Sequence, residues 1–453
     1  MNSHSVRIVI VGAGTFGLST AYHLGKSGYQ RVVCLDRWPY PSPSSAGYDL
    51  NKIMRTEYPD DVYTKLSHEA LNIWRKPMFS GIYNETGWLF CTDGTTEQGR
   101  VQAFDQSVEN TKQSGDASQM VELTSWEETV AMFPFLGNGK VGDNDTSKEL
   151  FRAIFNKNAG WIDSVKAMEL IGKECEGFGH VFHSGDQGTV VKILRDGSTG
   201  QVTGVQARDG TMYEADIVIL AMGAYSDTLL DYERQLEATA YAVTHIKLSE
   251  EQYKRYKDMP IINITDTSYL NSRDSQARTD DWGSKSFPRD SAYHPTDTQP
   301  LDAQRITQRF LKWMIPELAA EKIHSSRLCW DTECKFNFYH LSQGQTLNLF
   351  LAHDSNWIIG PHPSSPKSLF VATGGSGYSF KNFVNIGSYI VEMLEGKLDP
   401  ELQELWRWRP DRVGQDAEIE ARSRRPKLEL SEAEGWNHDH EVNVHRIWGQ
   451  SRY

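Results

Sequence analysis

The chain has 453 residues and a formal net charge of −13, with 39% apolar and 24% charged residues. This composition excludes a disordered chain, a collagen and a coiled coil. The acidic balance argues against a nucleic-acid or anionic-membrane partner, because both require a positive surface, and no run approaches the roughly 20 apolar residues of a membrane-spanning helix. A single core rarely exceeds about 300 residues, so at least two lobes are expected.

The five cysteines are odd in number and scattered along the chain. No CxxC pair or HExxH motif is present, so no metal site is expected. Free thiols and the lack of a signal-peptide pattern predict an intracellular, cytoplasmic protein. The last three residues are not the Ser-Lys-Leu address of peroxisomes.

The strongest pattern lies in the first thirty residues. The β-branched run Arg7–Val11 predicts a buried parallel strand, and a helix is expected over Leu18–Gly28. Between them lies a GxGxxG motif formed by Gly12, Gly14 and Gly17. In such a motif the first glycine permits a tight turn, the second lets the backbone approach a pyrophosphate, and the third lets helix and strand pack closely. The helix N-terminus offers free N–H groups to the phosphates.

A second strand is expected over Arg31–Leu35, and it ends at Asp36, about 20 residues beyond the last glycine of the motif. An acid at this distance bonds the ribose hydroxyls of a dinucleotide, and all parts of the pattern occur in the right order. The sequence therefore predicts a dinucleotide site. The charge of Asp36 disfavours the 2′-phosphate of NADP, although the neighbouring Arg37 leaves that question open.

The following segments favour FAD over a nicotinamide cofactor. A nicotinamide dehydrogenase usually continues with regular βα units, whereas residues 38–47 hold three prolines and predict an extended loop. Alternating apolar residues in Gly188–Ile193 and Val202–Ala207 predict a hairpin. An apolar strand then ends shortly before Gly223.

These segments resemble the FAD-dependent amine oxidases of the sarcosine oxidase and D-amino-acid oxidase type, and within that group the fungal fructosyl amino acid oxidases, or amadoriases. The resemblance covers most of residues 5–410. Besides the glycine motif it rests on four short segments, namely SSAG at 44–47, AMGA at 221–224, CWDT at 329–332 and GGSGYSFK at 374–381. Each segment alone is weak, and together they are specific.

The resemblance implies an α/β fold, with a Rossmann-like FAD-binding domain and a second, substrate domain built on an antiparallel sheet. The FAD domain is expected from the discontinuous segments 1–85, 155–235 and 325–410. The substrate domain is expected from 86–154 and 236–324, followed by a C-terminal tail at 411–453. The resemblance also implies FAD contacts for Gly12, Gly14, Thr15, Phe16, Gly17, Asp36, Arg37, Ser44, Ser45, Val190, Gly223, Cys329, Gly375, Gly377 and Lys381.

Two features of the expected flavin site carry chemistry. In the family, a cysteine in the setting of Cys329 is bonded through sulfur to the flavin, and Arg327 nearby would favour the thiolate that such a bond needs. The alternative is an inert buried cysteine. Backbone N–H groups of Gly374–Gly377 would face the flavin edge where negative charge develops on reduction, and a helix expected over Phe380–Ile390 would reinforce them.

The resemblance implies three catalytic positions. An amino-acid substrate carries a carboxylate, which Arg binds bidentately and Lys binds as a point charge. Lys381 ends the Gly-x-Gly-x-x-Phe-Lys pattern, and Arg55 follows the flavin loop, which is the SSAG segment at 44–47. Both are therefore expected to anchor the substrate. The alternative for either is a solvated surface cation. Tyr378 stands where many relatives carry His, and its role is left open.

The implied reaction is oxidation of the C–N bond of a secondary-amine amino acid, with fructosyl or other glycated amino acids as the leading substrates. The imine product is hydrolysed by water. Oxygen then takes the electrons from the reduced flavin and leaves as hydrogen peroxide. One alternative is oxidation of sarcosine, pipecolate, saccharopine or a secondary-metabolite intermediate. Another is a flavin-binding protein without oxidase turnover. The expected partners are the amino-acid substrate and oxygen, and the chain is expected to be a monomer.

Two segments depart from the family pattern. In relatives a strand of the substrate domain carries a lysine that promotes the reaction with oxygen, but here the chain passes from Leu270 directly into a polar stretch. No oxygen-activating residue is therefore assigned. A second departure is the insert Lys335–His353, which begins where an intron donor read in frame would encode Cys334-Lys335-Phe336. A gene-model error or splice variant would explain both; the alternative is a genuine loop, although loops of this length are uncommon.

Overall fold

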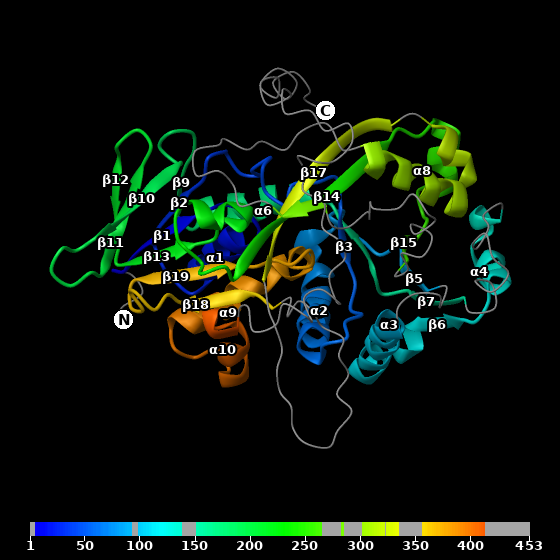
Figure 1. Cartoon of the computed structure of the whole chain (residues 1–453), viewed down its shortest axis with the longest axis horizontal. Coiled ribbons are helices and arrows are strands. Elements are labelled where there is room, and N and C mark those ends of the chain that lie inside the picture. Colours follow the sequence, from blue (N-terminus) through cyan, green and yellow to red (C-terminus); the bar gives the residue numbers. More distant parts are fainter. Residues whose placement is uncertain are drawn as a thin grey trace.

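The computed structural model of the chain describes residues 5–92, 98–137, 151–264, 282–284, 301–321, 323–334 and 356–412. Figure 1 shows two lobes, with a large sheet and its helices in one and a smaller group of strands and helices in the other. The long paired strands β14 (Leu236–Ile246) and β17 (Ile323–Cys334) run between them. The expected α/β fold class is confirmed.

A six-stranded sheet forms the centre of the first lobe. Its strand order is β18-β19-β13-β1-β2-β9, and all neighbours are parallel except β18, which is antiparallel to β19. The two strands predicted at the start of the chain are confirmed with their predicted bounds. The strands are β1 (Arg7–Val11), β2 (Arg31–Leu35), β9 (Val181–His183), β13 (Ile217–Leu220), β18 (Ile358–Pro361) and β19 (Leu369–Thr373).

Both faces of this sheet are covered, which explains why β1 is apolar at successive positions. Ile8 and Ile10 lie in a core shared with helices α1 (Thr15–Lys26), α6 (Ser164–Gly177) and α9 (Ile386–Leu394). Val9 and Val11 point to the opposite face. There they share a core with the antiparallel sheet of β10 (Val190–Arg195), β11 (Val202–Ala207) and β12 (Met212–Glu214). The predicted hairpin over this region is confirmed as β10 and β11.

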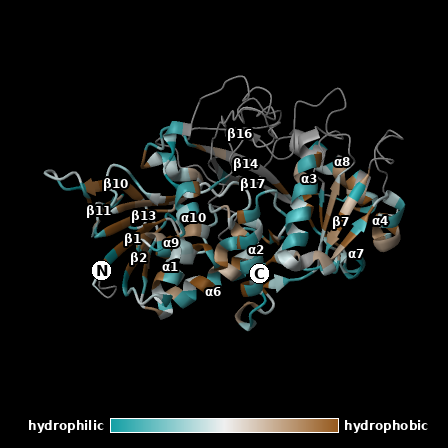
Figure 2. Cartoon of the chain, turned by 90° about the horizontal axis from the view of Figure 1, so that it is seen from below, coloured by the Kyte–Doolittle hydropathy of each residue, from teal (hydrophilic) through white to brown (hydrophobic). Residues whose placement is uncertain are grey.

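The second lobe is built on a four-stranded sheet in the order β15-β5-β7-β6. It is covered by amphipathic and short helices, and apolar residues such as Leu89 and Phe151 lie in its core. Its elements are β5 (Trp88–Thr92), α3 (Gln98–Thr111), β6 (Met120–Leu123), α4 (Trp126–Met132), β7 (Arg152–Asn156), α7 (Glu250–Tyr256), β15 (Ile261–Ile264) and α8 (Leu301–Met314). Figure 2 shows the same contrast, with brown strands inside and the largely teal and white helix α3 outside.

Two small antiparallel sheets lie between these bodies. One has the order β3-β8-β4 and the other β16-β14-β17. In the sheet β3-β8-β4, strand β3, which follows the flavin loop, pairs with residues 160–162. The remaining elements are β3 (Lys52–Met54), α2 (Asp61–Trp74), β4 (Tyr83–Asn84), β8 (Gly160–Ile162), β16 (Trp282–Ser284) and α10 (Pro400–Trp406).

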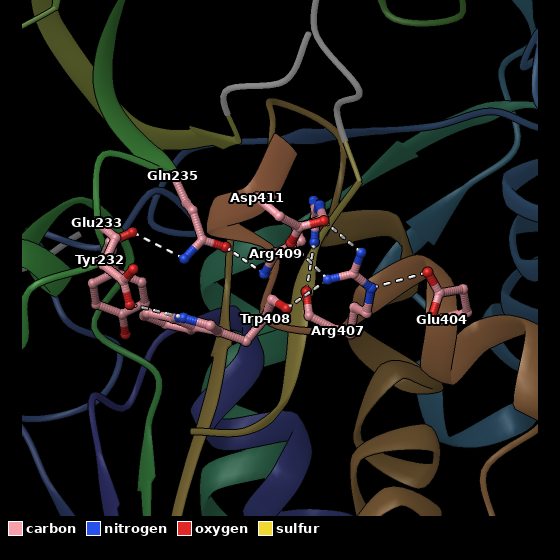
Figure 3. A network of polar contacts seen from close by, with 8 residues as sticks. All are labelled: Tyr232, Glu233, Gln235, Glu404, Arg407, Trp408, Arg409 and Asp411. Carbon is pink, nitrogen blue, oxygen red and sulfur yellow. Dashed lines mark hydrogen bonds and ion pairs between the residues drawn. The ribbon is translucent and has the colours of Figure 1, made fainter. Parts of the chain in front are cut away.

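A network of polar contacts fixes the end of the described chain (Figure 3). Arg409 is only 2% exposed. Its guanidinium donates to the carbonyl oxygens of Asn356, Trp357 and Arg407 at 2.9, 3.1 and 3.1 Å, and its backbone N–H donates to Gln235 Oε1 at 2.7 Å. These contacts join residues near 409 to the start of β18 and to the segment before β14.

The expected helix over Phe380–Ile390 differs in detail. Phe380–Val384 forms a 3₁₀ helix, and an α-helix follows from Ile386. The break allows Gly387 to approach α1 so closely that its N–H donates to Ser19 Oγ at 2.9 Å. A side chain at Gly387 would collide with the Ser19 carbonyl, so close packing decides the local form. The lysine-bearing strand sought after Leu270 and the insert Lys335–His353 lie outside the described residues.

Candidate active site

A long groove opens at the carboxyl ends of the parallel strands. The space it encloses, including the part open to solvent, is about 940 Å³. Its wall comes from six separate parts of the chain, which meet where β1, β2 and β13 end. The lining residues are Val11, Gly12, Gly14, Thr15, Phe16, Leu35, Asp36, Arg37, Ser42, Ser44, Ser45, Ala46, Gly188, Thr189, Val190, Ala221, Met222, Gly223, Ala224, Tyr225, Thr228, Asp331, Thr332, Gly375 and Ser379.

The three glycines of the motif have different surroundings. Gly12 has φ +104°, and a Cβ there would collide with the Ala221 carbonyl. A Cβ at Gly17 would collide with the carbonyl of Gly12. A Cβ at Gly14 would meet only the side chain of Ser45, with its Oγ at 3.0 Å. Gly12 and Gly17 therefore serve the turn and the packing, whereas Gly14 leaves room at the groove.

Asp36 lies at the end of β2 and is enclosed by backbone. Its carboxylate accepts N–H bonds from Ala13 at 2.8 Å and Trp38 at 2.9 Å. Burial raises the pKa of Asp36, and these backbone hydrogen bonds oppose that rise. The acid thus holds the glycine loop in place as well as facing the groove.

Several groove-lining groups have unused hydrogen-bond donors. Helix α1 begins at Thr15, its N-cap residue Gly14 supplies no side-chain cap for the first N–H groups, and Gly14, Thr15 and Phe16 line the groove. Arg37 Nη1 and Thr332 Oγ1 are buried without a hydrogen-bond partner in the described structure. Helix N-termini and buried orphan donors fit the phosphates and polar edges of a dinucleotide. The residues present therefore fit FAD.

The glycine-rich segment after β19 (Gly374–Gly377) is tied to the strand that carries Cys329. Gly377 N–H donates to Asp331 Oδ2 at 2.6 Å, and Ser376 N–H donates to the Thr332 carbonyl at 2.8 Å. Two amides that were expected to face the flavin edge are thus bonded within the chain. Gly375 lines the groove.

Cys329 is 6% exposed and lies beside the flavin loop. Its Sγ lies 3.6 Å from the Ala46 carbonyl and 3.8 Å from Lys52 Nζ. Lys52 also pairs with Asp49 at 3.1 Å, and Asp49 lies 3.4 Å from His245 Nε2. Among the side chains that the structure describes, the cation beside this sulfur is Lys52, which the sequence pattern did not single out. The side chain of Arg327 is not among those that the structure describes.

Lys381 and Arg55 meet over one aromatic ring. Lys381 Nζ lies 4.9 Å from the centroid of the Tyr58 ring, and the Arg55 guanidinium carbon lies 4.1 Å from it. Lys381 is 4% exposed and donates to the Tyr378 carbonyl at 2.7 Å. Burial lowers the pKa of Lys381 well below its usual value, and the charge of Arg55 lowers it further. Neither side chain is a solvated surface cation, since Lys381 is buried and Arg55 half-buried.

A buried carboxyl group lies next to these cations. Glu57 is fully enclosed, and its oxygens accept from Asn156 Nδ2 at 2.8 Å and Thr56 N at 3.0 Å. Burial raises the pKa of Glu57, while Arg55 and the hydrogen bonds oppose the rise. Asp331 also raises the pKa of Lys381, so two acids, Glu57 and Asp331, partly offset the effects of burial and of Arg55 on this amine.

Tyr378 forms part of an aromatic cluster behind Lys381. Its ring lies 5.5 Å from Tyr58, 5.1 Å from Tyr63 and 5.9 Å from Trp357, with the last pair stacked. Tyr63 is fixed in turn, because its hydroxyl donates to Asn356 Oδ1 at 2.7 Å. The cluster gives the site a stiff apolar wall.

The groove brings together most of the residues predicted to bind the cofactor. Outside the lining are Gly17, Cys329, Gly377 and Lys381. Gly17 packs against the Gly12 carbonyl inside the fold. Cys329, Gly377 and Lys381 lie close to lining residues, either along the chain or in space. Sequence reasoning missed Thr189, Asp331 and Thr332 in the groove and Lys52, Glu57 and Tyr58 beside it. Only Asp331 and Thr332 carried a signal, as part of the CWDT segment.

Comparison with known proteins defines the class. Residues 7–393 match the model of the FAD dependent oxidoreductase family. The chain therefore belongs to that family. It is an FAD-dependent oxidoreductase that acts on C–N bonds.

Two relatives and two solved structures give the nearer context. L-saccharopine oxidase of Schizosaccharomyces pombe is 32% identical, over 94% of this chain and 98% of its own length. Amino acid oxidase imqH of Aspergillus flavus is 24% identical, over 88% and 97%. Fructosyl peptide oxidase from E. terrenum superposes with a TM-score of 0.78 at 28% identity, covering 98% of this chain and all of the other. Amadoriase I from Aspergillus fumigatus gives 0.73 at 25% identity, covering 96% and 97%.

Two further properties concern only the described part of the chain. Within it, no group of three or more His, Cys, Asp or Glu side chains is arranged to hold a metal ion. Its helices are all too short or too polar to cross a bilayer.

Proposed function

We propose that this chain is an oxidase of secondary-amine amino acids, with glycated amino acids as the first candidates and oxygen as the electron acceptor. The observation that carries the proposal is the pair of cations, Arg55 and Lys381, that share the Tyr58 ring. Lys381 follows Gly375 and Ser379, which line the groove, and Arg55 lies near Lys381 at the Tyr58 ring. This is the arrangement needed to hold a carboxylate while the neighbouring carbon faces a flavin.

When bound, FAD supplies the acceptor for the hydride equivalent that leaves the substrate. The chain supplies orientation. Arg55 takes the substrate carboxylate with its planar fork, and Lys381 adds a point charge. Burial of Lys381 and the aromatic cluster behind it exclude water, which strengthens both contacts. Since Lys381 loses its proton readily, its amine is also able to take a proton as the carboxylate arrives.

A second candidate function has its own support. The relative that matches nearly the full chain at 32% identity is named L-saccharopine oxidase. Saccharopine is itself a secondary-amine amino acid, so the same clamp serves it. Sarcosine, pipecolate and a secondary-metabolite intermediate are further candidate substrates, and a flavin-binding protein without turnover is a candidate of a different class.

One experiment separates these candidates. The purified yellow protein is mixed with fructosyl amino acids, saccharopine, sarcosine and pipecolate, with and without air. We expect bleaching of the flavin without air and hydrogen peroxide under air for at least one secondary amine. Bleaching without peroxide would indicate a dehydrogenase. No bleaching with any amine would contradict the proposal and favour a flavin-binding protein without turnover.

We also propose a covalent bond between Cys329 and FAD. Support comes from the position of the thiol beside the flavin loop and from Lys52 Nζ at 3.8 Å, because a neighbouring cation favours the thiolate. We expect acid-precipitated protein to stay yellow, with the flavin on a peptide that contains Cys329. Cys329→Ala is expected to release all of the colour. Cys175→Ala is the control, since Cys175 is fully buried in another core and should leave the colour unchanged. A colourless wild-type precipitate would contradict the bond.

The domain boundaries remain a proposal, with FAD-domain segments 1–85, 155–235 and 325–410 and substrate-domain segments 86–154 and 236–324. The packing of Arg409 on the start of β18 supports an FAD domain that extends to about residue 410.

We further propose a monomer in a reducing cytoplasmic compartment. The four cysteines whose side chains the structure describes are buried thiols outside any disulfide, which supports the proposal of a reducing compartment. Light scattering and a fluorescent fusion would test these two statements.

A further inference from the structure

Asp331 joins two distant segments of the chain at the wall of the groove. It lies on β17 and lines the groove, and its side chain reaches the glycine-rich segment after β19. Its Oδ2 accepts the backbone N–H of Gly377 at 2.6 Å, and its Oδ1 accepts that of Thr332 at 2.7 Å. Hydrogen bonds donated by backbone N–H groups favour the charged form of a carboxyl group. The wall of the groove therefore carries a fixed negative charge at this position.

The turn at residues 374–377 has an unusual backbone. Gly374 and Gly377 have φ of +80° and +74°, which glycine adopts freely, but Ser376 has φ +49°. A residue with a side chain is uncommon in this left-handed region and remains there only where its surroundings hold it. Here the Ser376 N–H donates to the Thr332 carbonyl at 2.8 Å, and its Oγ donates to the Gly374 carbonyl at 3.0 Å. Two neighbouring residues of β17 thus hold the turn.

The carboxylate of Asp331 also packs directly against the backbone of Gly375, which lines the groove. A Cβ added at Gly375 would lie 2.9 Å from Asp331 Oδ1 and 2.8 Å from Ser379 Oγ. No side chain at position 375 fits between these two oxygens without a shift. The acid and the turn therefore form one close-packed part of the groove wall.

The same turn leads to Lys381. The Tyr378 N–H donates to the Gly375 carbonyl at 3.1 Å, and the Tyr378 carbonyl accepts from Lys381 Nζ at 2.7 Å. The charge of Asp331 also raises the pKa of Lys381, against the effect of burial. Asp331 thus acts on this amine in two ways, through the backbone that bonds the amine and through its own charge.

We propose that Asp331 is a positioning residue of the active site, which holds the turn at 374–377 in its left-handed form and keeps a negative charge at the wall of the flavin groove. This charge opposes the negative charge that a flavin gains on reduction, so it lowers the reduction potential of the bound flavin. A lower potential favours the passage of electrons from the reduced flavin to oxygen. The part that concerns Lys381 rests on the proposed function, whereas the part that concerns the flavin does not.

The test is the two-electron reduction potential of the holoenzyme with Asp331→Asn, measured against a reference dye during reduction by xanthine and xanthine oxidase. The substitution removes the charge and keeps the size of the side chain. We expect a more positive potential, with the ratio of reduced to oxidised flavin at a fixed dye ratio raised roughly tenfold. This is the effect of losing a unit charge about 10 Å away at an effective dielectric constant of about 20. An unchanged potential would overturn the proposal.

Asp196→Asn is the matched control. The Asp196 carboxylate accepts from the N–H groups of Ser198 at 3.1 Å and Thr199 at 2.8 Å, so it too holds a turn by two backbone bonds. Asp196 and these two partners are not among the described residues that line the groove. We expect this variant to lower the melting temperature of the holoenzyme and to leave the flavin potential unchanged. An equal change of potential in both variants would reflect a general loss of stability and would also overturn the proposal.

A double-mutant cycle with Ser376→Gly separates the turn from the charge. Glycine adopts the left-handed conformation at position 376 without strain, so the turn depends less on Asp331 in this background. We expect Asp331→Asn to lower the melting temperature by a few degrees alone and by clearly less together with Ser376→Gly, whereas the potential should change equally in both backgrounds. Additive losses of stability would overturn the role of Asp331 in the turn.

The double variant also keeps the proposal testable if Asp331→Asn alone does not fold, because its turn is relaxed. These measurements require no amine substrate. A protein that shows the expected potentials but no bleaching with any amine would therefore contradict the proposed function and leave Asp331 as a positioning residue of the flavin groove.

Discussion

Gly14→Val is expected to give a folded protein that contains no FAD. The added side chain would meet no backbone of the protein, since only the Ser45 hydroxyl, at 3.0 Å, and its Cβ lie close to the Cβ position. It would instead fill the space beside the first N–H groups of α1, where a pyrophosphate must approach the backbone. The flavin absorbance per chain is the measurement, and circular dichroism shows whether the fold is retained.

Two other glycine variants make this result specific. Gly17→Val is expected to prevent folding, because its side chain would occupy the position of the Gly12 carbonyl. Gly177→Val is expected to retain both fold and flavin, since nothing lies within 4 Å of its Cβ position. If Gly14→Val purifies with a full complement of FAD, the assignment of the groove to the dinucleotide is wrong.

The part of the fold that sequence predicted well is governed by local chemistry. A strand bounded by glycine at Gly12 has an unambiguous start and end, and the apolar runs of β1 and β2 are continuous because both faces of the sheet are covered. The alternation in β10 and β11 likewise identifies a hairpin with one exposed face. In these places periodicity, turn residues and burial all point to the same structure.

The parts that sequence could not give depend on contacts between distant segments. Lys52 and Cys329 are 277 residues apart, and only the pairing of β14 with β17 brings the sulfur to the flavin loop. Nothing in the local pattern distinguishes Lys52 from a surface lysine. The break in the helix after Phe380 has the same origin, because the close approach of Gly387 to Ser19 sets it.

The same limit applies to buried polar groups near the cation pair. Tyr58 and Trp88 belong to no motif in the sequence, and the burial of their unpaired donors is visible only once the enclosing side chains are placed. Glu57 is a comparable case, since an acid in a loop is normally solvated and here it is bonded to Asn156 from β7. Chemistry of this kind follows from tertiary packing and has no short motif.

Lys381→Met is expected to weaken the binding of a carboxylate substrate by about 1.5–3 kcal/mol, or roughly 10- to 150-fold in KM, the range for a hydrogen bond to a charged group. The flavin spectrum should change little, because the Gly375 and Ser379 backbone remains in place. Lys397→Met is the control, since Lys397 is exposed and, among the described residues, its ammonium group bonds only Glu395. An unchanged KM in Lys381→Met would remove Lys381 from the site.

The same variant carries a pH test whose sign follows from burial. In the folded, substrate-free protein the pKa of Lys381 is lowered, so between that pKa and about 10.5 the unfolded chain holds a proton that the native state has lost. The free energy of unfolding must then rise with pH across this window, and Lys381→Met should reduce that slope by up to one proton.

Substrate binding gives a second measurement. Since a bound carboxylate favours the charged amine, substrate binding by the wild type should also take up a proton. Calorimetry in two buffers of different ionisation enthalpy would detect this uptake. Equal slopes in both proteins and no proton uptake would show that Lys381 is charged throughout and acts only as a fixed cation.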